Sequence, residues 1–237
     1  MTCIVDSLFP QVGEAVVAVL ERLGIEVEFP DAQTCCGQPA YNGGFTAEAR
    51  KVALRFLDVF APTAPDPIVA PSGSCAAMVV HAYPDLFKDD LPNLVRAQAV
   101  ADRTYEFTQF LVDVLGITDA GAQFNGELTY HASCHLLRFL HVTDQPLRLL
   151  ANVRGARVTA LPGAEECCGF GGLFAVKFGG VSGAILDKKI ENIRATGAGH
   201  VVGCDMSCLM HIQGGLNRDG VLVKCLHIAE VLARHAG

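Results

Sequence analysis

The stretch Glu165–Gly172, EECCGFGG, carries two adjacent cysteines followed at once by glycine, and Gln33–Ala40, QTCCGQPA, carries the same triplet. Around each triplet the spacing of the cysteines is nearly identical. In the first set 31 and 38 residues separate the pair from its neighbours, and in the second set 32 and 39. Such a long-period repeat predicts a duplicated half-chain. The two sets are Cys3, Cys35, Cys36 and Cys75, and Cys134, Cys167, Cys168 and Cys208.

The hydrophobic pattern alternates between the periods of helices and strands in both halves. Apolar residues at helical spacing predict helices over 10–24 and 46–60, and short aliphatic runs predict strands over 25–29 and 67–72. This alternation predicts an α/β fold of two similar βα-repeat halves with parallel sheets, related by a pseudo-twofold duplication. We expect a first CCG half over 1–118 and a second over 119–237. In the second half, elements are predicted in turn over 127–133, 144–154, 156–161, 182–194 and 200–204.

The cysteines follow the predicted strands. Because loops converge at the carboxyl ends of parallel strands, we expect each half to gather four thiolates at one point. Cys3 differs from its counterpart Cys134, since only Met1 and Thr2 precede it and no leading strand is visible. The sequence therefore predicts a first site whose scaffold is less complete, or a start that is assigned too late, and a second site that is more secure.

Four converging thiolates suit a soft metal centre, either zinc or an iron–sulfur cluster. Structural zinc usually takes two short cysteine pairs, whereas here the only short pair is directly adjacent. A cluster contains several irons, so adjacent cysteines can serve different atoms. We expect one iron–sulfur cluster in each half, with the eight cysteines of the two sets as ligands. A zinc-stabilised module without enzymatic activity, buried free cysteines and disulfides are the alternatives.

Composition excludes several other classes of function. The formal charge of −7, without any run of Lys or Arg, predicts no binding to nucleic acid. No apolar run is long enough to span a membrane, and no secretory signal is legible, so we expect a cytoplasmic protein. No G-x-G-x-x-G motif follows a strand, and no paired carboxylates suggest acid–base catalysis. The catalytic residues, if any, are unknown from sequence.

Four motifs carry a resemblance to a known family: QTCCGQPAYNGG (33–44), PSGSCAAM (71–78), ECCGFGG (166–172) and CLMH (208–211). They resemble the duplicated cysteine-rich CCG domain of the heterodisulfide reductase type, and within it a lactate-utilization branch. The resemblance covers essentially the whole chain. It implies an electron-transfer component of an L-lactate oxidation complex, working with other iron–sulfur or oxidoreductase subunits that together convert lactate to pyruvate.

Two alternatives keep the clusters and change the function: a heterodisulfide reductase-like thiol/disulfide redox subunit, or the iron–sulfur subunit of another 2-hydroxy acid oxidase. The heterodisulfide reductase type closes each set with C-x₂-C, where this chain has Ser72 before Cys75 and Asp205 before Cys208. Each site is left with four cysteines, which favours a [4Fe–4S] cluster. The ferredoxin-like C-x₂-C-x₂-C-x₃-C segments of related subunits are absent from the sequence.

The remaining candidate residues are expected to have supporting roles. We expect Cys204 and Cys225, which have no counterpart in the repeat, to pack in the core. Near the second set, His131, His135 and His211 are expected to form hydrogen bonds rather than to ligate metal. Lys177 is expected to be exposed.

Overall fold

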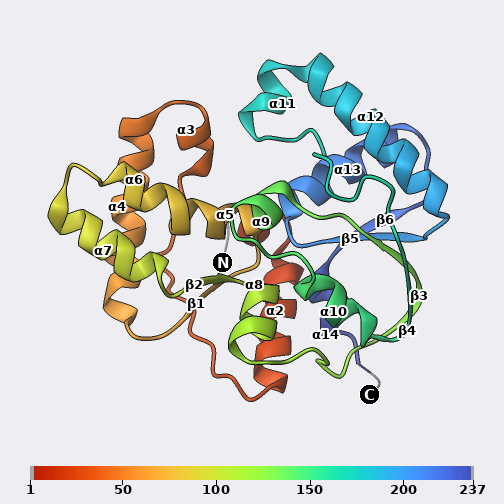
Figure 1. The fold of residues 1–237 in the computed structure, drawn as a ribbon, viewed down its shortest axis with the longest axis horizontal. Helices are drawn as coiled ribbons and strands as arrows, with labels where there is room; N and C mark the ends of the chain where they lie inside the picture. The colour runs from red at the N-terminus through yellow and green to blue at the C-terminus, as the bar shows by residue number, and fades with distance from the viewer. Residues whose placement is uncertain (1–2, 236–237) are drawn as a thin grey trace.

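Two parallel sheets organise residues 3–235, the part of the chain that this computed structural model describes (Figure 1). The smaller sheet pairs β1 (Ile68–Ala70) with β2 (Thr104–Glu106). In the larger sheet the strand order is β4-β3-β5-β6, and every pair is parallel. The expected α/β class is therefore confirmed. The strands of the larger sheet are β3 (Gln123–Tyr130), β4 (Arg154–Thr159), β5 (His200–Gly203) and β6 (Lys224–His227).

Helices separate the strands throughout. The helices predicted over 10–24, 46–60, 144–154 and 182–194 are confirmed as α2, α4, α10 and α12, with ends that move by a few residues. Before the larger sheet lie α1 (Cys3–Leu8), α2 (Pro10–Arg22), α3 (Gln38–Asn42), α4 (Thr46–Phe60), η1 (Ala61–Thr63), α5 (Gly73–Ala77), η2 (Met78–Ala82), α6 (Tyr83–Leu86), α7 (Leu91–Ala101), α8 (Phe107–Gln109) and η3 (Phe110–Val114). The later helices are α9 (Cys134–Arg138), α10 (Gln145–Ala151), α11 (Leu173–Lys177), α12 (Gly179–Thr196), α13 (Met206–Arg218) and α14 (Ile228–Ala233).

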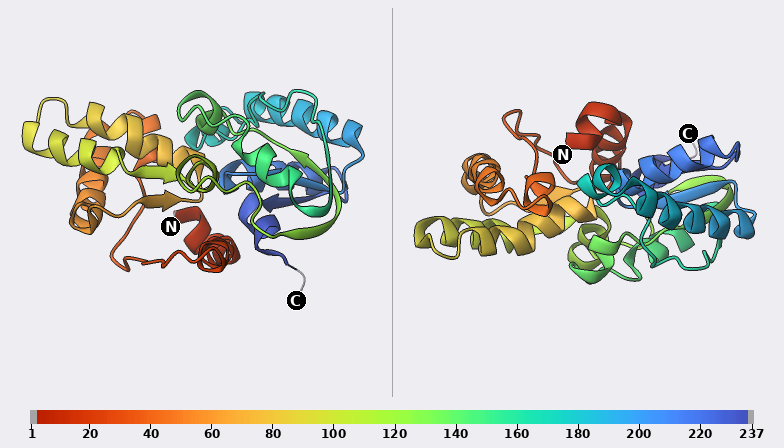
Figure 2. Two further views of the ribbon diagram at one scale, coloured as in Figure 1. Left: turned by 60° about the horizontal axis from the view of Figure 1, so that its bottom comes forward. Right: turned by 90° about the horizontal axis from the view of Figure 1, so that it is seen from above.

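The larger sheet is covered by helices on both faces (Figures 1 and 2). Leu128 and Val202 belong to a core shared with α2, α10 and α14, whereas Val201 belongs to a core shared with α12 and α13. Neighbouring valines facing opposite cores show the two-residue period of a strand. Burial on both faces explains the consecutive valines of β5.

Helix α2 ties the amino-terminal part of the chain to the larger sheet. It packs against α14, and Ala15, Val16, Val19 and Leu20 lie in the same core as that helix. At its end the Arg22 guanidinium donates to the carbonyls of Leu232, at 2.5 Å, and Ala233, at 3.1 Å. The largest core thus includes residues from both expected halves, and the division at 118 and 119 stays a prediction.

The predicted strand over 25–29 is wrong, because this stretch has no partner among the described residues. Its counterpart in the repeat is β4, which is held in its sheet by hydrogen bonds to β3. The counterpart of β3 would lie upstream of Cys3, and Met1 and Thr2 are outside the described residues. The sequence pattern also did not reveal β2, which pairs with β1 in the smaller sheet.

Buried hydrogen bonds join the helices that carry the last cysteine of each set. Ser72 caps α5 by accepting from the Cys75 N–H at 3.2 Å, and Asp205 caps α13 by accepting from the Ser207 N–H at 3.1 Å. The second Asp205 oxygen accepts from the Ser72 hydroxyl at 3.1 Å and from the Ser74 N–H at 2.9 Å. The two positions where the resemblance would place further cysteines therefore bind each other across the repeat.

The counterpart residues Glu106 and His227 occupy the ends of β2 and β6. Each pairs with the last residue of the neighbouring strand, and each caps the following helix with a capping box. Both are fully buried. One oxygen of Glu106 accepts from the Thr108 N–H at 2.7 Å and the Gln109 N–H at 3.2 Å, while the other has no hydrogen-bond partner among the described residues. Burial raises the pKa of Glu106 to about 7.

We expect Asp205→Ala to lower the free energy of unfolding by roughly 2–4 kcal/mol, because the change leaves buried donors unpaired and removes a helix cap. Chemical denaturation of the metal-free protein measures this loss. Asp144→Ala is the matched control, since Asp144 precedes α10, is exposed and makes no side-chain cap hydrogen bond. Equal stability of the two variants would contradict the bridging role of Asp205.

Glu106 should make the protein less stable as pH rises. Because its folded pKa, about 7, lies above the unfolded value of 4.5, the native state holds the proton more tightly between these values. Stability is therefore lost as pH rises through this window, by about 3 kcal/mol in total. Glu106→Gln should remove this loss in denaturation at pH 5 and pH 8. Glu48→Gln, on the exposed face of α4, should behave like the unchanged protein. An unaltered pH slope in Glu106→Gln would overturn the assignment.

Candidate metal centre

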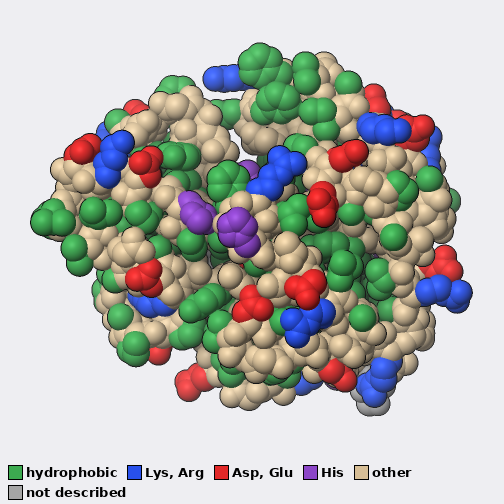
Figure 3. All heavy atoms as spheres, in the orientation of Figure 1, with side chains coloured by type: hydrophobic (Ala, Val, Ile, Leu, Met, Phe, Trp, Pro, Cys, Tyr) green, Lys and Arg blue, Asp and Glu red, His purple; other side chains and the backbone are tan. Residues whose placement is uncertain are grey.

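All eight cysteines of the two sets line one cavity of about 160 Å³. The cavity lies where the start of α3 and the loop before α11 approach each other, and the space-filling view is hollowed between these two lobes (Figure 3). Histidine side chains gather just below the hollow on this face. The structure therefore brings together every cysteine that the sequence singled out as a candidate ligand.

In the first set the four thiols form a chain of contacts. The sulfur atoms of Cys36 and Cys75 lie 3.4 Å apart, and the Gly37 N–H donates to the Cys35 sulfur at 3.4 Å. Hydrogen bonds from the thiols of Cys3 and Cys36 lower the pKa of Cys35. A metal that binds here would replace the shared protons, because thiolates are the ligand form of cysteine.

The second set repeats this arrangement. The Gly169 N–H donates to the Cys167 sulfur at 3.3 Å, and hydrogen bonds from the thiols of Cys134 and Cys168 lower the pKa of Cys167. Hydrogen bonds with the thiols of Cys167 and Cys208 raise the pKa of Cys168. Each half thus holds one stabilised thiolate between neighbouring thiols, with a backbone N–H directed at its sulfur.

The glycine of each CCG triplet is required by the backbone. Gly37 has φ +87° and Gly169 has φ +93°, a region that residues with a Cβ rarely adopt. At Gly169 an added Cβ would lie 2.6 Å from the carbonyl oxygen of Ser182 on α12. The turn at these glycines directs their N–H groups at the sulfurs of Cys35 and Cys167. The glycine of each triplet therefore helps to position a candidate ligand.

His131 lies beside the second set. Its ring, 1% exposed, offers a nitrogen that lies within 4.8 Å of the Cys168 and Cys208 sulfurs, and neither ring nitrogen has a hydrogen-bond partner among the described residues. Burial lowers the pKa of His131 to about 4, so the imidazole is neutral at physiological pH. An unpartnered neutral imidazole next to two thiols fits a bound metal group, either as a ligand or as a hydrogen-bond partner of a cluster.

The other two histidines lie on either side of the site. The Nδ1 atom of His135 lies 3.7 Å from the Cys134 sulfur, and the Nε2 atom of His211 lies 3.4 Å from the Ser182 hydroxyl. Cys204 is fully buried in the core, as predicted, and Cys225 packs beside another core from β6. Lys177 is exposed, also as predicted.

One basic residue near the site was missed by sequence reasoning. Lys189 on α12 is 1% exposed, and its ammonium donates to the Gly163 carbonyl at 2.5 Å. Burial lowers its pKa, which Glu166 and the second set of cysteines oppose by charge. The residue at the same distance beyond Cys36 is the buried Leu57. A lysine on the apolar face of a predicted helix was the available signal, and it distinguishes the second site from the first.

The donor set fits a soft metal group better than isolated structural thiols. All ten cysteines are free, and eight of them converge although mutual repulsion of thiolates opposes this. No lysine or arginine is among the described residues that line this cavity, so protons or a metal group must offset the repulsion. Among residues 3–235 we find no helix with the length and apolar character that crossing a bilayer would need.

Comparison with known proteins agrees with this geometry. The chain matches the CCG cysteine-rich domain family twice, over residues 1–80 and 128–213. It is 48% identical over 232 residues to lactate utilization protein A of Bacillus pumilus (strain SAFR-032), and 50% identical over 232 residues to lactate utilization protein A 1 of Bacillus cereus (strain AH820). Each match covers 98% of this chain and 96% of the relative. The two cysteine sets and these matches place the chain in the CCG cysteine-rich domain family.

Proposed function

We propose that this chain is an iron–sulfur electron-transfer subunit of an L-lactate oxidation complex. The observation that carries the proposal is the convergence of two four-thiol sets on one cavity. Cys3, Cys35, Cys36 and Cys75 would hold one cluster, and Cys134, Cys167, Cys168 and Cys208 would hold the other. When bound, such clusters supply one-electron transfer. The Gly37 and Gly169 N–H groups would donate to the thiolate sulfurs and favour the bound, negatively charged state.

The link to lactate comes from the relatives, whose names refer to lactate utilization. Among the described residues that line the cysteine cavity, Asp205 is the one carboxylate, and it is held by a helix cap and a serine hydroxyl. We therefore assign removal of hydrogen from lactate to partner subunits, and passage of electrons to this chain. We place the protein in the cytoplasm, where ten free thiols are stable.

A [4Fe–4S] cluster in each half is the form that the residues favour. A fifth cysteine ligand, as in the heterodisulfide reductase type, would stand at Ser72 and Asp205. These two side chains instead hydrogen-bond to each other and to the starts of α5 and α13. Four cysteines per set remain, the number that a [4Fe–4S] cluster takes. This argues against a thiol-transforming activity in which the cluster binds substrate sulfur.

Anaerobic reconstitution with iron and sulfide tests the proposal. We expect a brown protein with about eight irons and eight acid-labile sulfides per chain, four for each set of thiolates. Cys36→Ser and Cys168→Ser should each reduce both numbers by about half, because each removes one ligand from one set. Electron transfer to lactate-complex partners is then measured with the reconstituted chain. A colourless protein that carries zinc and no labile sulfide would contradict the cluster assignment.

The two clusters should differ in stability. On brief exposure to air, the Cys168→Ser protein, which keeps only the first site, should lose iron faster than the Cys36→Ser protein. The reason is that no strand among the described residues leads into Cys3, and the first site has Leu57 where the second has Lys189. Iron analysis against time measures the order. The reverse order would refute the argument from the scaffold.

Lys189→Leu should weaken the second site and make it resemble the first. In the Cys36→Ser background we expect about tenfold weaker iron retention and a more negative reduction potential, because a buried positive charge near a negative cluster is removed. Lys188→Leu is the matched control, since its ammonium faces Glu191 at 2.8 Å and is exposed. If both variants retain iron equally at the same potential, Lys189 has no electrostatic role in the site.

A further inference from the structure

The side chain of His131 lies against the second set of cysteines, and both of its ring nitrogens are unpaired among the described residues. The ring is 1% exposed, and one of its nitrogens lies within 4.8 Å of the sulfurs of Cys168 and Cys208. An imidazole carries at least one N–H in either charge state, and a buried donor that stays unpaired is costly. The sulfurs of the second set, and the group that they bind, are therefore the acceptors to consider for this N–H.

The backbone around His131 directs its ring toward the cysteines. The His131 N–H donates to the Val202 carbonyl on β5 at 2.8 Å, and the Ala132 N–H donates to the Ala164 carbonyl at 3.2 Å. Successive side chains of an extended segment point to opposite faces. Because Tyr130 packs in the core of α2, α10 and α14, the ring of His131 points to the other face, where the second set lies. The Ala164 carbonyl beside this ring is already paired with the Ala132 N–H, so the ring N–H is free to meet a sulfur.

Donation to a sulfur suits His131 better than ligation of a metal atom. The second set already supplies four cysteines, the number that a [4Fe–4S] cluster takes, so each iron has its own thiolate. Reduction adds negative charge to a cluster, and hydrogen bonds to its sulfurs are among the factors that set its reduction potential. An N–H donated by His131 stabilises the reduced state more than the oxidised state, because hydrogen bonds to charged acceptors are the stronger ones. The reduction potential of this cluster is thereby raised.

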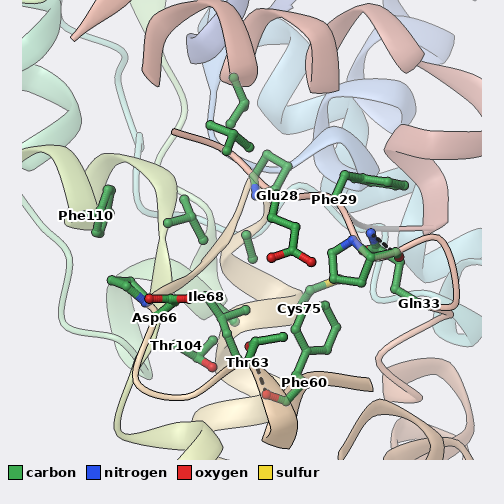
Figure 4. Close-up of a pocket in the computed structure, with 18 of the residues that line it drawn as sticks. Glu28, Phe29, Gln33, Phe60, Thr63, Asp66, Ile68, Cys75, Thr104 and Phe110 are labelled. Atoms are coloured by element: carbon green, nitrogen blue, oxygen red, sulfur yellow. Dashed lines mark hydrogen bonds between the residues drawn. The ribbon is translucent and has the colours of Figure 1, made fainter. Parts of the chain in front are cut away.

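The first set of cysteines has a different environment. Cys36 and Cys75, the counterparts of Cys168 and Cys208, both line a mainly apolar cavity of about 280 Å³ between α2, β1 and residues 25–30 (Figure 4). Among the described residues that line it there is no histidine, lysine or arginine, while three carry carboxylates: Glu26, Glu28 and Asp66. These acids are exposed, so solvent screens their charge, and the lack of an N–H donor is the larger difference from the second set.

The buried charges near the two sets do not oppose this difference. The Lys189 ammonium is buried near the second set, where its positive charge also favours a reduced cluster. The Asp205 carboxylate borders both sets, because it accepts from the Ser74 N–H of α5 at 2.9 Å and from the Ser207 N–H of α13 at 3.1 Å. Asp205 therefore favours neither set, and the N–H of His131 and the charge of Lys189 both favour reduction of the second.

We propose that His131 donates a ring N–H to a sulfur of the cluster in the second set and thereby makes this cluster the higher-potential site of the chain. An electron that reaches the first cluster then passes to the second, so that the first is oxidised, the second is reduced, and no other bond changes. His131 acts through the sulfur and touches no substrate. The inference rests on the proposed iron–sulfur function and adds a direction of electron transfer within the chain.

Redox titration of the second cluster alone tests this role of His131. In the Cys36→Ser background, His131→Leu should lower the reduction potential by about 59 mV, which corresponds to about tenfold weaker uptake of one electron. His131→Gln should recover most of this shift, because its side-chain amide also offers N–H groups. His200→Leu is the matched control and should leave the potential unchanged, since His200 begins β5 at the end away from Gly203 and packs edge-on against Phe124.

A spectroscopic readout separates hydrogen-bond donation from a merely structural role. Electron–nuclear double resonance of the reduced cluster, in ordinary and in heavy water, should detect an exchangeable proton coupled to the electron spin. This proton should be present with His131 and with His131→Gln and absent in His131→Leu. Isotopically labelled histidine should show only weak nitrogen coupling, because the nitrogen reaches the cluster through its proton. Should His131→Leu hold no cluster, the labelled unchanged protein decides, and absence of a coupled histidine proton overturns the proposal.

Iron and sulfide analysis of each variant separates the two ways of failing. An unchanged chain that takes up no iron and labile sulfide contradicts the proposed function, and the inference with it. Full cluster content with equal potentials in His131→Leu and its background overturns the role of His131 alone, as does the strong nitrogen coupling of a direct ligand. The proposal also fails if the Cys168→Ser protein, which keeps only the first cluster, has a higher potential than the Cys36→Ser protein.

Discussion

The structure depends on holding eight cysteine sulfurs in one cavity, where not all of them can be thiolates at once. Thiolates repel one another, and a cavity lined by two sets of them is unfavourable unless protons or metal neutralise the charge. The cysteines lie near the starts of helices or in the two CCG turns, and in each turn a backbone N–H is directed at one sulfur. Cys35 and Cys167 are the clearest cases, each with a glycine N–H within 3.4 Å. The helices and sheets serve to bring these short segments to one place.

Features that depend on local sequence could be predicted, whereas features that depend on pairing between distant segments could not. The cysteine spacing predicted the duplication, and the aliphatic runs predicted α2, α4, β1 and β5, because these elements follow from local periodicity. The strand at 25–29 was wrong because pairing is not local: its partner is not among the described residues. β2 was missed because its three residues, Thr104–Glu106, include no aliphatic side chain.

The two halves differ in buried polar residues whose contacts the sequence did not reveal. At equivalent positions the halves carry Ser72 and Asp205, and also Glu106 and His227. In the first pair the Ser72 hydroxyl donates to the Asp205 carboxylate. Either half taken alone contains only one of the two residues that form this hydrogen bond. These pairings lie between halves, more than 100 residues apart in sequence, and only the folded chain reveals them.

The unequal preparation of the two sites follows from how Cys3 and Cys134 are held. Cys134 follows β3 directly, and β3 is paired on both edges. Cys3 begins α1, whose Val5 is fully buried in the core of α12 and α13, with Leu209 and Ile212. The first ligand of the first set is therefore positioned by helices of the second half rather than by its own sheet. Loosening of α13, which also carries Cys208, would disturb ligands of both sets, so the two sites are mechanically linked through this one helix.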